Sequence, residues 1–172
     1  MDSFNLLIST SRFREEEGQD EILDLLDKFG DPDAESEITE IKGILLAETT
    51  LDPFEVIKKL KELVASEPWE IRYILRVLPI ESVVPTELDT IRLATKNLAA
   101  KIVNDSFRIT IEKRHSAMES LGAIKAIAGE IESKVDLENP VWIVLVEIIG
   151  NQTGLSVLNP DQMFSSVIEK RK

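Results

Sequence analysis

Residues 106–131 read SFRITIEKRHSAMESLGAIKAIAGEI, and this stretch decides which fold the sequence predicts. Its first seven residues alternate polar and apolar side chains, which predicts a strand with one buried face and Arg108 on the wet face. From Ser116 onward apolar residues recur at helical spacing, which predicts a helix that begins near Ser116. The apolar stripe of this helix consists of Leu121, Ile124, Ile127, Ala128 and Ile131.

The neighbouring segments extend this strand and helix into an α/β unit. Residues 86–103 predict a helix, in which Thr86 and Asp89 resemble a capping box. Residues 141–149, VWIVLVEII, are apolar on both faces and therefore predict a central strand. A glycine-containing turn then leads into a last strand at 155–158. We expect these elements to form a sheet of mixed strand order.

The first 78 residues predict a second kind of unit. Its elements are a strand at 4–10, a helix that ends at Gly30, two strands within 35–50 that turn at Lys42-Gly43, a helix opened by Asp52 and Pro53, and a strand at 70–78. The order strand, helix, strand, strand, helix, strand is that of a ferredoxin-like split βαβ unit.

The predicted fold class is α/β (α+β) with two domains. The predicted boundaries are a ferredoxin-like domain at 1–78, a connector at 79–85, an α/β domain at 86–158 and a C-terminal tail helix at 159–172. The connector lies between two prolines, and the tail carries an amphipathic pattern at 161–170.

The composition limits the classes of protein to consider. The chain has 172 residues, of which 43% are hydrophobic, and it contains no cysteine, so disulfides, thiolate zinc sites, iron–sulfur clusters and cysteine nucleophiles are excluded. The start, MDSFNLLISTSRF, has an acidic residue where a secretory signal carries positive charge. The apolar run at 141–149 is far shorter than the roughly 20 residues that cross a bilayer. We therefore expect a cytoplasmic protein without a membrane partner.

Negative charge is concentrated in the front part of the chain. The formal net charge is -12, and residues 1–66 hold 17 of the 32 acidic residues but only 7 of the 20 basic ones. An acidic total argues against nucleic-acid binding, because neutralisation of phosphates supplies much of the affinity. The argument applies to the contacting face alone, so nucleic-acid binding by the rest of the chain stays open.

The run at 106–131, together with KVDLENPVWIVLVEIIGNQTGLSVL at 134–158, resembles the THUMP domain. This RNA-binding module occurs in tRNA thiouridine synthetases, tRNA methyltransferases and pseudouridine synthases. The shared marks are a strand that ends in Lys113-Arg114, a small hydroxyl residue that opens the next helix, and VDLENP before a buried strand. The resemblance covers about residues 85–158. In those families the module follows an N-terminal ferredoxin-like domain, an order that this sequence shares.

The resemblance implies a part in tRNA modification without catalysis. We expect no catalytic domain after Leu158, and a pairing of these two domains alone is similar to the adaptor proteins that accompany tRNA cytidine acetyltransferase. We therefore expect a tRNA-binding adaptor that presents the acceptor arm and 3′ end to a separate enzyme, for N4-acetylcytidine formation. Two alternatives are a tRNA-binding subunit of another tRNA-modifying enzyme and a small-molecule-binding or assembly domain of ferredoxin-like type. We expect no DNA partner.

A basic cluster lies where the predicted strand meets the predicted helix, and the amide groups of a helix N-terminus attract anions. We expect Arg114 to grip a phosphate with two hydrogen bonds, Lys113 to add a point charge and Ser116 to donate its hydroxyl. An alternative of equal weight on the residues alone is that Lys113 and Arg114 pair with Glu112 and Glu119. The predicted RNA-binding residues are Lys101, Arg108, Lys113, Arg114, His115, Ser116 and Lys125.

The single histidine, His115, predicts RNA contact and not catalysis. A transition-metal site needs further histidine or cysteine ligands, which the chain lacks. Histidine in a loop can instead stack on a base or bind a phosphate. The sequence contains no Walker loop, no GxGxxG and no nucleophile elbow. We therefore expect no catalytic residue, no cofactor and no metal, and a protein that is not an enzyme.

Overall fold

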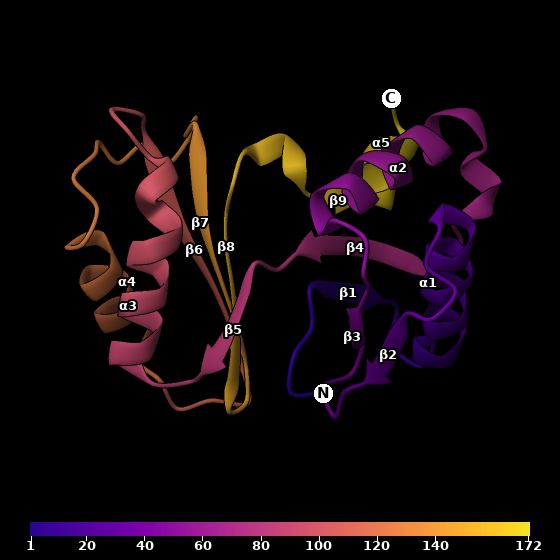
Figure 1. The fold of residues 1–172 in the computed structure, drawn as a ribbon, viewed down its shortest axis with the longest axis horizontal. Helices are drawn as coiled ribbons and strands as arrows, with labels where there is room; N and C mark the ends of the chain where they lie inside the picture. Colours follow the sequence, from indigo (N-terminus) through magenta and orange to yellow (C-terminus); the bar gives the residue numbers. More distant parts are fainter. The chain divides into compact units, whose positions relative to one another are not determined.

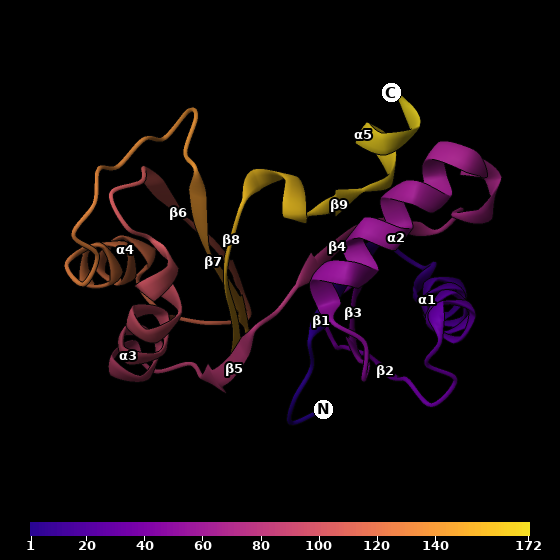
Figure 2. The same ribbon diagram turned by 45° about the horizontal axis from the view of Figure 1, so that its top comes forward.

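The computed structural model describes all residues from 1 to 172 and divides the chain into two compact units (Figures 1 and 2). The first unit comprises Met1–Ile80 and Asp161–Lys172, and the second comprises Glu81–Pro160. The chain therefore leaves the first unit once, forms the second, and returns to complete the first. None of the helices is long and apolar enough to span a membrane.

The first unit is a five-stranded antiparallel sheet with helices. Its strands are β1 (Leu6–Thr10), β2 (Glu35–Ile38), β3 (Ile44–Glu48), β4 (Ile74–Pro79) and β9 (Phe164–Ser165), in the order β2-β3-β1-β4-β9. Its helices are α1 (Glu15–Phe29), α2 (Pro53–Ser66) and α5 (Ser166–Lys170), with a short 3-10 helix at Pro68–Glu70. The first four strands, α1 and α2 follow the predicted split βαβ order, and the predicted fold class is confirmed.

Local signals in the sequence explain where the helices of the first unit begin and end. Gly30 ends α1 in the left-handed conformation at φ 118°, as predicted. Asp52 opens α2 by accepting a hydrogen bond of 2.9 Å from the Phe54 amide, and Pro53 takes the first helical position. Both helices bury an apolar stripe against the sheet, and Ile22 and Leu60 are fully buried in this core.

The C-terminal tail adds a strand as well as a helix to the first unit. Val77 of β4 pairs with Phe164 of β9, and the Phe164 ring is buried in the same core as β1. The sequence predicted only an amphipathic helix here. A strand of two residues is too short to show a periodic pattern, so the prediction missed it.

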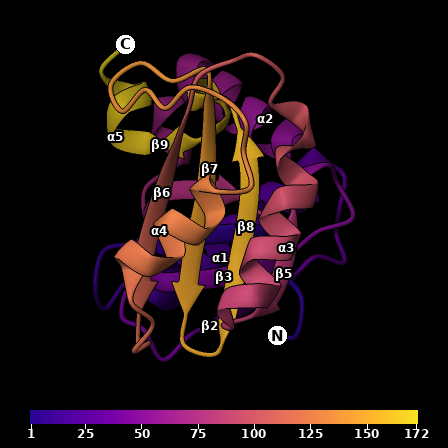
Figure 3. The same ribbon diagram turned by 90° about the vertical axis from the view of Figure 1, so that its left-hand side faces the viewer.

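The second unit is a four-stranded mixed sheet covered by two helices. Its strands are β5 (Ser82–Pro85), β6 (Phe107–Arg114), β7 (Trp142–Ile149) and β8 (Gln152–Leu158), in the order β5-β8-β7-β6. Its helices are α3 (Leu88–Leu98) and α4 (Ser120–Ala128), which lie across one face of the sheet (Figure 3), and short 3-10 helices occupy Ala99–Lys101 and Pro160–Gln162. Only β6 and β7 run parallel, and β7 is central, as predicted.

Two helix starts in the second unit differ from the prediction. Thr86 does not cap α3: the helix begins at Leu88, and the Thr86 hydroxyl lies 2.9 Å from the Thr153 hydroxyl of β8. The helix predicted from Ser116 begins at Ser120. This later start leaves Leu121 in the first turn, 58% exposed instead of in the core. Of the other four stripe residues, Ile127 is fully buried, whereas Ile124, Ala128 and Ile131 are half-buried.

Candidate nucleic-acid interface

The predicted anion site at a helix start is not formed. Strand β6 continues through Arg114, the chain then turns at His115 with φ 53°, and α4 begins only at Ser120. The side chain of Glu119 caps this helix by accepting a hydrogen bond of 2.9 Å from the Gly122 amide. A carboxylate of the protein therefore occupies the position that was predicted for a phosphate. The Ser116 hydroxyl accepts a hydrogen bond of 3.2 Å from the Met118 amide instead.

Arg114 holds a buried ion pair inside the second unit. Its Nη1 donates a hydrogen bond of 2.8 Å to Oε2 of Glu147 on the neighbouring strand β7. The side chain of Glu147 is 1% exposed and that of Arg114 is 18% exposed. Burial of both partners explains the pair, because a lone carboxylate in this position would be costly. Internal pairing, the alternative left open by the sequence, is therefore realised for Arg114, with a partner other than the two expected.

Lys101 is also engaged within the second unit. Its Nζ donates hydrogen bonds of 2.8 and 2.7 Å to the two carboxylate oxygens of Glu81 and one of 2.8 Å to the carbonyl of Val157. The Glu81 carboxylate in turn accepts the amide of Val157 at 2.8 Å. Lys101 thus joins the segment after α3 to strand β8 and to Glu81, which directly precedes β5.

Three predicted basic residues remain available on the surface. Lys113 is exposed, and its Nζ donates one hydrogen bond of 2.9 Å to the Met118 carbonyl, which leaves two further N–H donors. His115 is exposed beside it. Lys125 is exposed on α4 and forms no ion pair. Arg108, on the sheet face away from the helices, is half-buried and donates to the Leu137 carbonyl at 3.2 Å.

The first unit carries an aromatic and basic tip that the sequence prediction missed. Phe13, in the loop between β1 and α1, is 77% exposed and has φ 69°, an unusual conformation for a bulky residue. The Lys42 ammonium lies 5.4 Å from the centre of the Phe13 ring. Arg12 and Arg14 flank the ring in sequence and are exposed. The signal in the sequence was the run SRFR at 11–14, a basic and aromatic segment within the acidic part of the chain.

Hydrogen bonds fix this tip. The amide of Thr10 donates to the Gly43 carbonyl at 2.9 Å, and the Gly43 amide donates to Oε1 of Glu15 at 2.9 Å. The hydrogen bond from the Gly43 amide holds the pKa of Glu15 below its usual value. Gly43 adopts φ 79°, and a Cβ there would lie 2.8 Å from the Thr10 carbonyl oxygen, so only glycine fits. The loops that carry Phe13 and Lys42 are therefore tied together.

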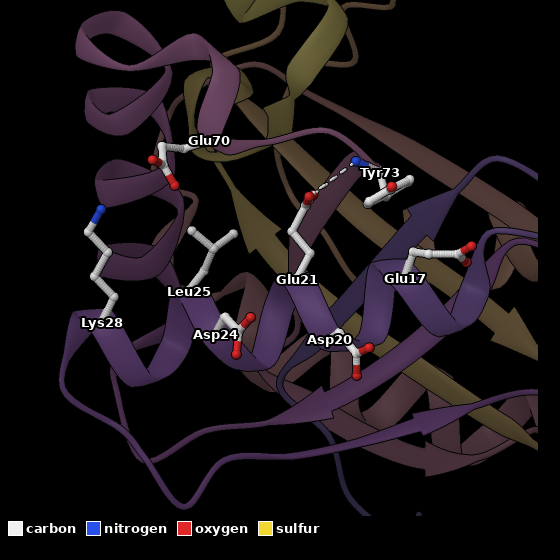
Figure 4. A pocket seen from close by; sticks show the side chains of 8 residues that line it. All are labelled: Glu17, Asp20, Glu21, Asp24, Leu25, Lys28, Glu70 and Tyr73. Carbon is white, nitrogen blue, oxygen red and sulfur yellow. Dashed lines mark hydrogen bonds between the residues drawn. The ribbon is translucent and has the colours of Figure 1, made fainter.

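The outer face of α1 is acidic and hollowed. A hollow of about 330 Å³ lies beside α1 and is lined by Glu17, Asp20, Glu21, Asp24, Leu25, Lys28, Glu70 and Tyr73 (Figure 4). The Glu21 carboxylate points to the start of β4 and accepts the amides of Arg72, Tyr73 and Ile74. Glu21 therefore braces the first unit, and the carboxylates around it repel phosphates.

Comparison with known proteins defines the class of the second unit. Residues 85–158 match the sequence model of the THUMP domain family. The chain therefore contains a THUMP domain, and the resemblance noted from the sequence is confirmed. No curated protein matches the chain.

Solved structures share the fold of both units. PH1313 from Pyrococcus horikoshii Ot3 is 16% identical with a TM-score of 0.66 over 91% of this chain and 54% of its own, and TrmN from Thermus thermophilus is 16% identical with a TM-score of 0.57 over 88% and 44%. A 4-thiouridine synthetase in complex with RNA and ATP is 14% identical with a TM-score of 0.57 over 95% and 42%. The chain thus spans about half of the length of these proteins.

Proposed function

We propose that this protein binds tRNA and takes part in tRNA modification. The observation that carries the proposal is the THUMP domain at residues 85–158, which implies tRNA binding and involvement in tRNA modification. One protein of the same fold is a 4-thiouridine synthetase whose structure contains RNA. The fold of that protein matches over 95% of this chain, so the likeness includes the first unit as well as the THUMP domain.

Exposed basic and imidazole side chains of the THUMP domain are the proposed phosphate contacts. Lys113, His115 and Lys125 present side chains to solvent without an ion-pair partner in the protein. Contact with phosphates releases counterions from the RNA, which makes the affinity depend on salt. Arg114 and Lys101 are not proposed as phosphate contacts, because they already pair with Glu147 and Glu81.

The tip of the first unit is the proposed contact for an unpaired base. Bases without a pairing partner stack on exposed aromatic rings, and nearby cations hold the adjoining phosphates. Phe13 offers such a ring, and Arg12 and Lys42 offer the cations. Glu15 and Glu17 compete little for this role, since Glu15 accepts the Gly43 amide and Glu17 pairs with Arg14 at 3.2 Å.

The finer part of the proposal is an adaptor role. We propose that the protein presents the acceptor arm and 3′ end of tRNA to a separate enzyme and is not itself catalytic. The partner is a tRNA cytidine acetyltransferase, and the product is N4-acetylcytidine. This part rests on the resemblance to the adaptor proteins that accompany that enzyme, which also combine a ferredoxin-like domain with a THUMP domain.

Two experiments test the proposal at its two levels. Titration of labelled tRNA with the protein tests binding, and we expect tighter binding of intact tRNA than of tRNA trimmed of its terminal CCA. Equal affinity for both would move the contact away from the 3′ end.

Incubation of tRNA and acetyl-CoA with the acetyltransferase, with and without this protein, tests the adaptor role. We expect N4-acetylcytidine to increase at least tenfold with the protein, and an unchanged yield contradicts the adaptor role alone.

A further inference from the structure

Glu15 is an acidic residue next to the basic and aromatic tip of the first unit. It is the first residue of α1 and directly follows Arg12, Phe13 and Arg14. If only its charge mattered, a carboxylate at this place would weaken the binding of RNA, because it repels phosphates. Its contacts indicate another role, since the half-buried side chain reaches to the loop before β3.

The Glu15 carboxylate faces both loops of the tip. Its Oε1 accepts the Gly43 amide at 2.9 Å, and Gly43 directly follows Lys42. Hydrogen bonds from the backbone of Gly43, of Glu15 itself and, less strongly, of Phe13 lower the pKa of this carboxyl. The ionised carboxylate therefore contacts the loop of Lys42 and the loop of Phe13 at the same time.

The backbone around Gly43 is held from two sides. The Gly43 carbonyl accepts the Thr10 amide at 2.9 Å, while the Gly43 amide donates to Glu15. Gly43 is buried between these partners, and the next residue, Ile44, is the first of β3. Lys42 thus extends from a glycine whose two backbone groups are both bound, and one of the two bonds comes from Glu15.

Phe13 and Lys42 have little else to hold them in place. The Phe13 ring is 77% exposed and its backbone has φ 69°, a conformation that persists in a bulky residue only when its surroundings impose it. Lys42 is exposed, and its ammonium lies over the ring at 5.4 Å from the centre. An exposed cation–π contact is weak and does not order two loops by itself. The order of the tip therefore depends on the backbone contacts beneath it.

We propose that Glu15 is a positioning residue for RNA recognition, because its carboxylate fixes Lys42 over Phe13 and so prepares the tip for an unpaired base. The inference rests on the proposed function, in which Phe13 and Lys42 contact RNA, and it assigns no RNA contact to Glu15 itself. Binding to an ordered tip loses less conformational entropy than binding to a mobile one. Loss of Glu15 therefore weakens tRNA binding, although it removes a negative charge beside the RNA.

Glu15→Ala and Glu16→Ala separate positioning from charge. Both remove a carboxylate from the first turn of α1, but Glu16 is exposed and does not contact Gly43. In fluorescence anisotropy with labelled tRNA, we expect Glu15→Ala to bind roughly threefold more weakly and Glu16→Ala to bind as the wild type or more tightly. Glu15→Gln keeps an oxygen that accepts the Gly43 amide and restores most of the affinity. Glu15→Ala that binds as tightly as Glu16→Ala overturns the proposal.

A background without the tip contacts shows whether Glu15 acts through them. In the variant Phe13→Ala with Lys42→Ala, we expect the addition of Glu15→Ala to leave the tRNA affinity unchanged, because nothing remains to be positioned. A further loss as large as in the wild-type background would show that Glu15 acts through the fold as a whole, and this result overturns the proposal. Circular dichroism and the urea midpoint establish that each variant is folded.

NMR spectroscopy of the free protein measures the positioning without tRNA. The ring current of Phe13 shifts the signals of the Lys42 εCH2 protons upfield as long as the ammonium lies over the ring. We expect this shift to disappear in Glu15→Ala and to persist in Glu15→Gln and Glu16→Ala, and its persistence in Glu15→Ala overturns the proposal. Wild-type tRNA affinity of Phe13→Ala with Lys42→Ala instead contradicts the base contact and with it the recognition role, whereas the NMR shift still reports whether Glu15 orders the tip.

Discussion

Arg114 and Lys113 are adjacent residues with different roles. Arg114 is bound to the buried carboxylate of Glu147, whereas Lys113 is exposed and donates to one loop carbonyl. Removal of one partner from a buried ion pair costs far more than loss of an exposed charge. The two side chains, which are indistinguishable in the sequence pattern, therefore separate into a structural residue and a candidate RNA contact.

We expect Arg114→Ala to lower the free energy of unfolding by about 3 to 5 kcal/mol, because it leaves Glu147 without its arginine. Lys113→Ala removes an exposed charge and costs less than about 1 kcal/mol. Urea denaturation of both variants measures the difference. We expect the double variant Arg114→Ala with Glu147→Gln to recover part of the lost stability, because it removes the unpaired charge. Equal stability of Arg114→Ala and Lys113→Ala would show that the ion pair is not structural.

Substitution of Phe13 is expected to change the affinity for tRNA without changing the stability of the fold. Its ring is 77% exposed, so Phe13→Ala has little effect on the urea midpoint. If a base stacks on the ring, the same change weakens tRNA binding by about 1 to 3 kcal/mol. Phe13→Trp retains the stacking surface and is the control. Loss of affinity in both variants, or in neither, contradicts a stacking contact.

At the scale of elements, carboxylates join segments that are distant in the sequence. Asp31, just after α1, is buried and accepts the Thr49 hydroxyl at 2.6 Å and the Thr50 amide at 2.8 Å, both in the loop before α2. Glu15 similarly joins the start of α1 to the loop before β3. The hydrogen bond from Thr49 lowers the pKa of Asp31, and the hydrogen bond from Gly43 lowers that of Glu15.

These lowered pKa values predict how stability depends on pH. A carboxyl group whose pKa is lower in the folded chain stabilises the fold above its unfolded pKa, near 4, and loses this contribution as the pH falls through its folded pKa. We expect the urea midpoint to fall between about pH 5 and pH 2. Asp31→Asn lowers the midpoint at pH 7 and makes its decline with acid shallower. If the urea midpoint of Asp31→Asn depends on pH as that of the wild type does, Asp31 does not contribute to the loss of stability in acid.

The sequence predicted the elements whose signals are local. Ile22 in α1 and Leu60 in α2 each belong to an apolar stripe at helical spacing. Gly30 marks the end of α1, Asp52 marks the start of α2, and the apolar run in β7 marks a central strand. Most of the fold follows from such patterns. The start of α4 was missed because Glu119 was not recognised as its N-cap. This signal is also local, since the Glu119 side chain accepts a hydrogen bond from the Gly122 amide three residues later.

The candidate site was less predictable than the fold. The partner of Arg114 is Glu147, 33 residues away on another strand. The partner of Lys101 is Glu81, which directly precedes β5 in the segment that the sequence treated as a connector. Such contacts depend on strand register, which no local pattern specifies. The tip at Phe13 was missed for the same reason, because Lys42 approaches the ring from a different loop.

At the scale of the whole molecule, charge separates surfaces by function. Residues 1–66 hold more than half of the acidic residues, and several of them gather along α1. A surface of this charge repels phosphates and attracts basic surfaces, so we expect it to stay off RNA and to suit a basic protein partner. We expect lysine in place of Glu16, Asp20 and Asp24 to weaken co-purification of the modifying enzyme at low salt and to leave tRNA affinity the same or higher. Unchanged co-purification would identify the face as an ordinary solvated helix.

The salt dependence of tRNA affinity is the most direct test of the central claim that the THUMP domain contacts tRNA phosphates. Fluorescence anisotropy with labelled tRNA at several salt concentrations measures it for the wild type, for Lys113→Ala with Lys125→Ala, and for Lys58→Ala, which removes an exposed lysine of the first unit. We expect the double variant to bind more weakly and its plot of log affinity against log salt to flatten by about one per lost contact, with Lys58→Ala unchanged. A double variant with the affinity and slope of the wild type would contradict the claim.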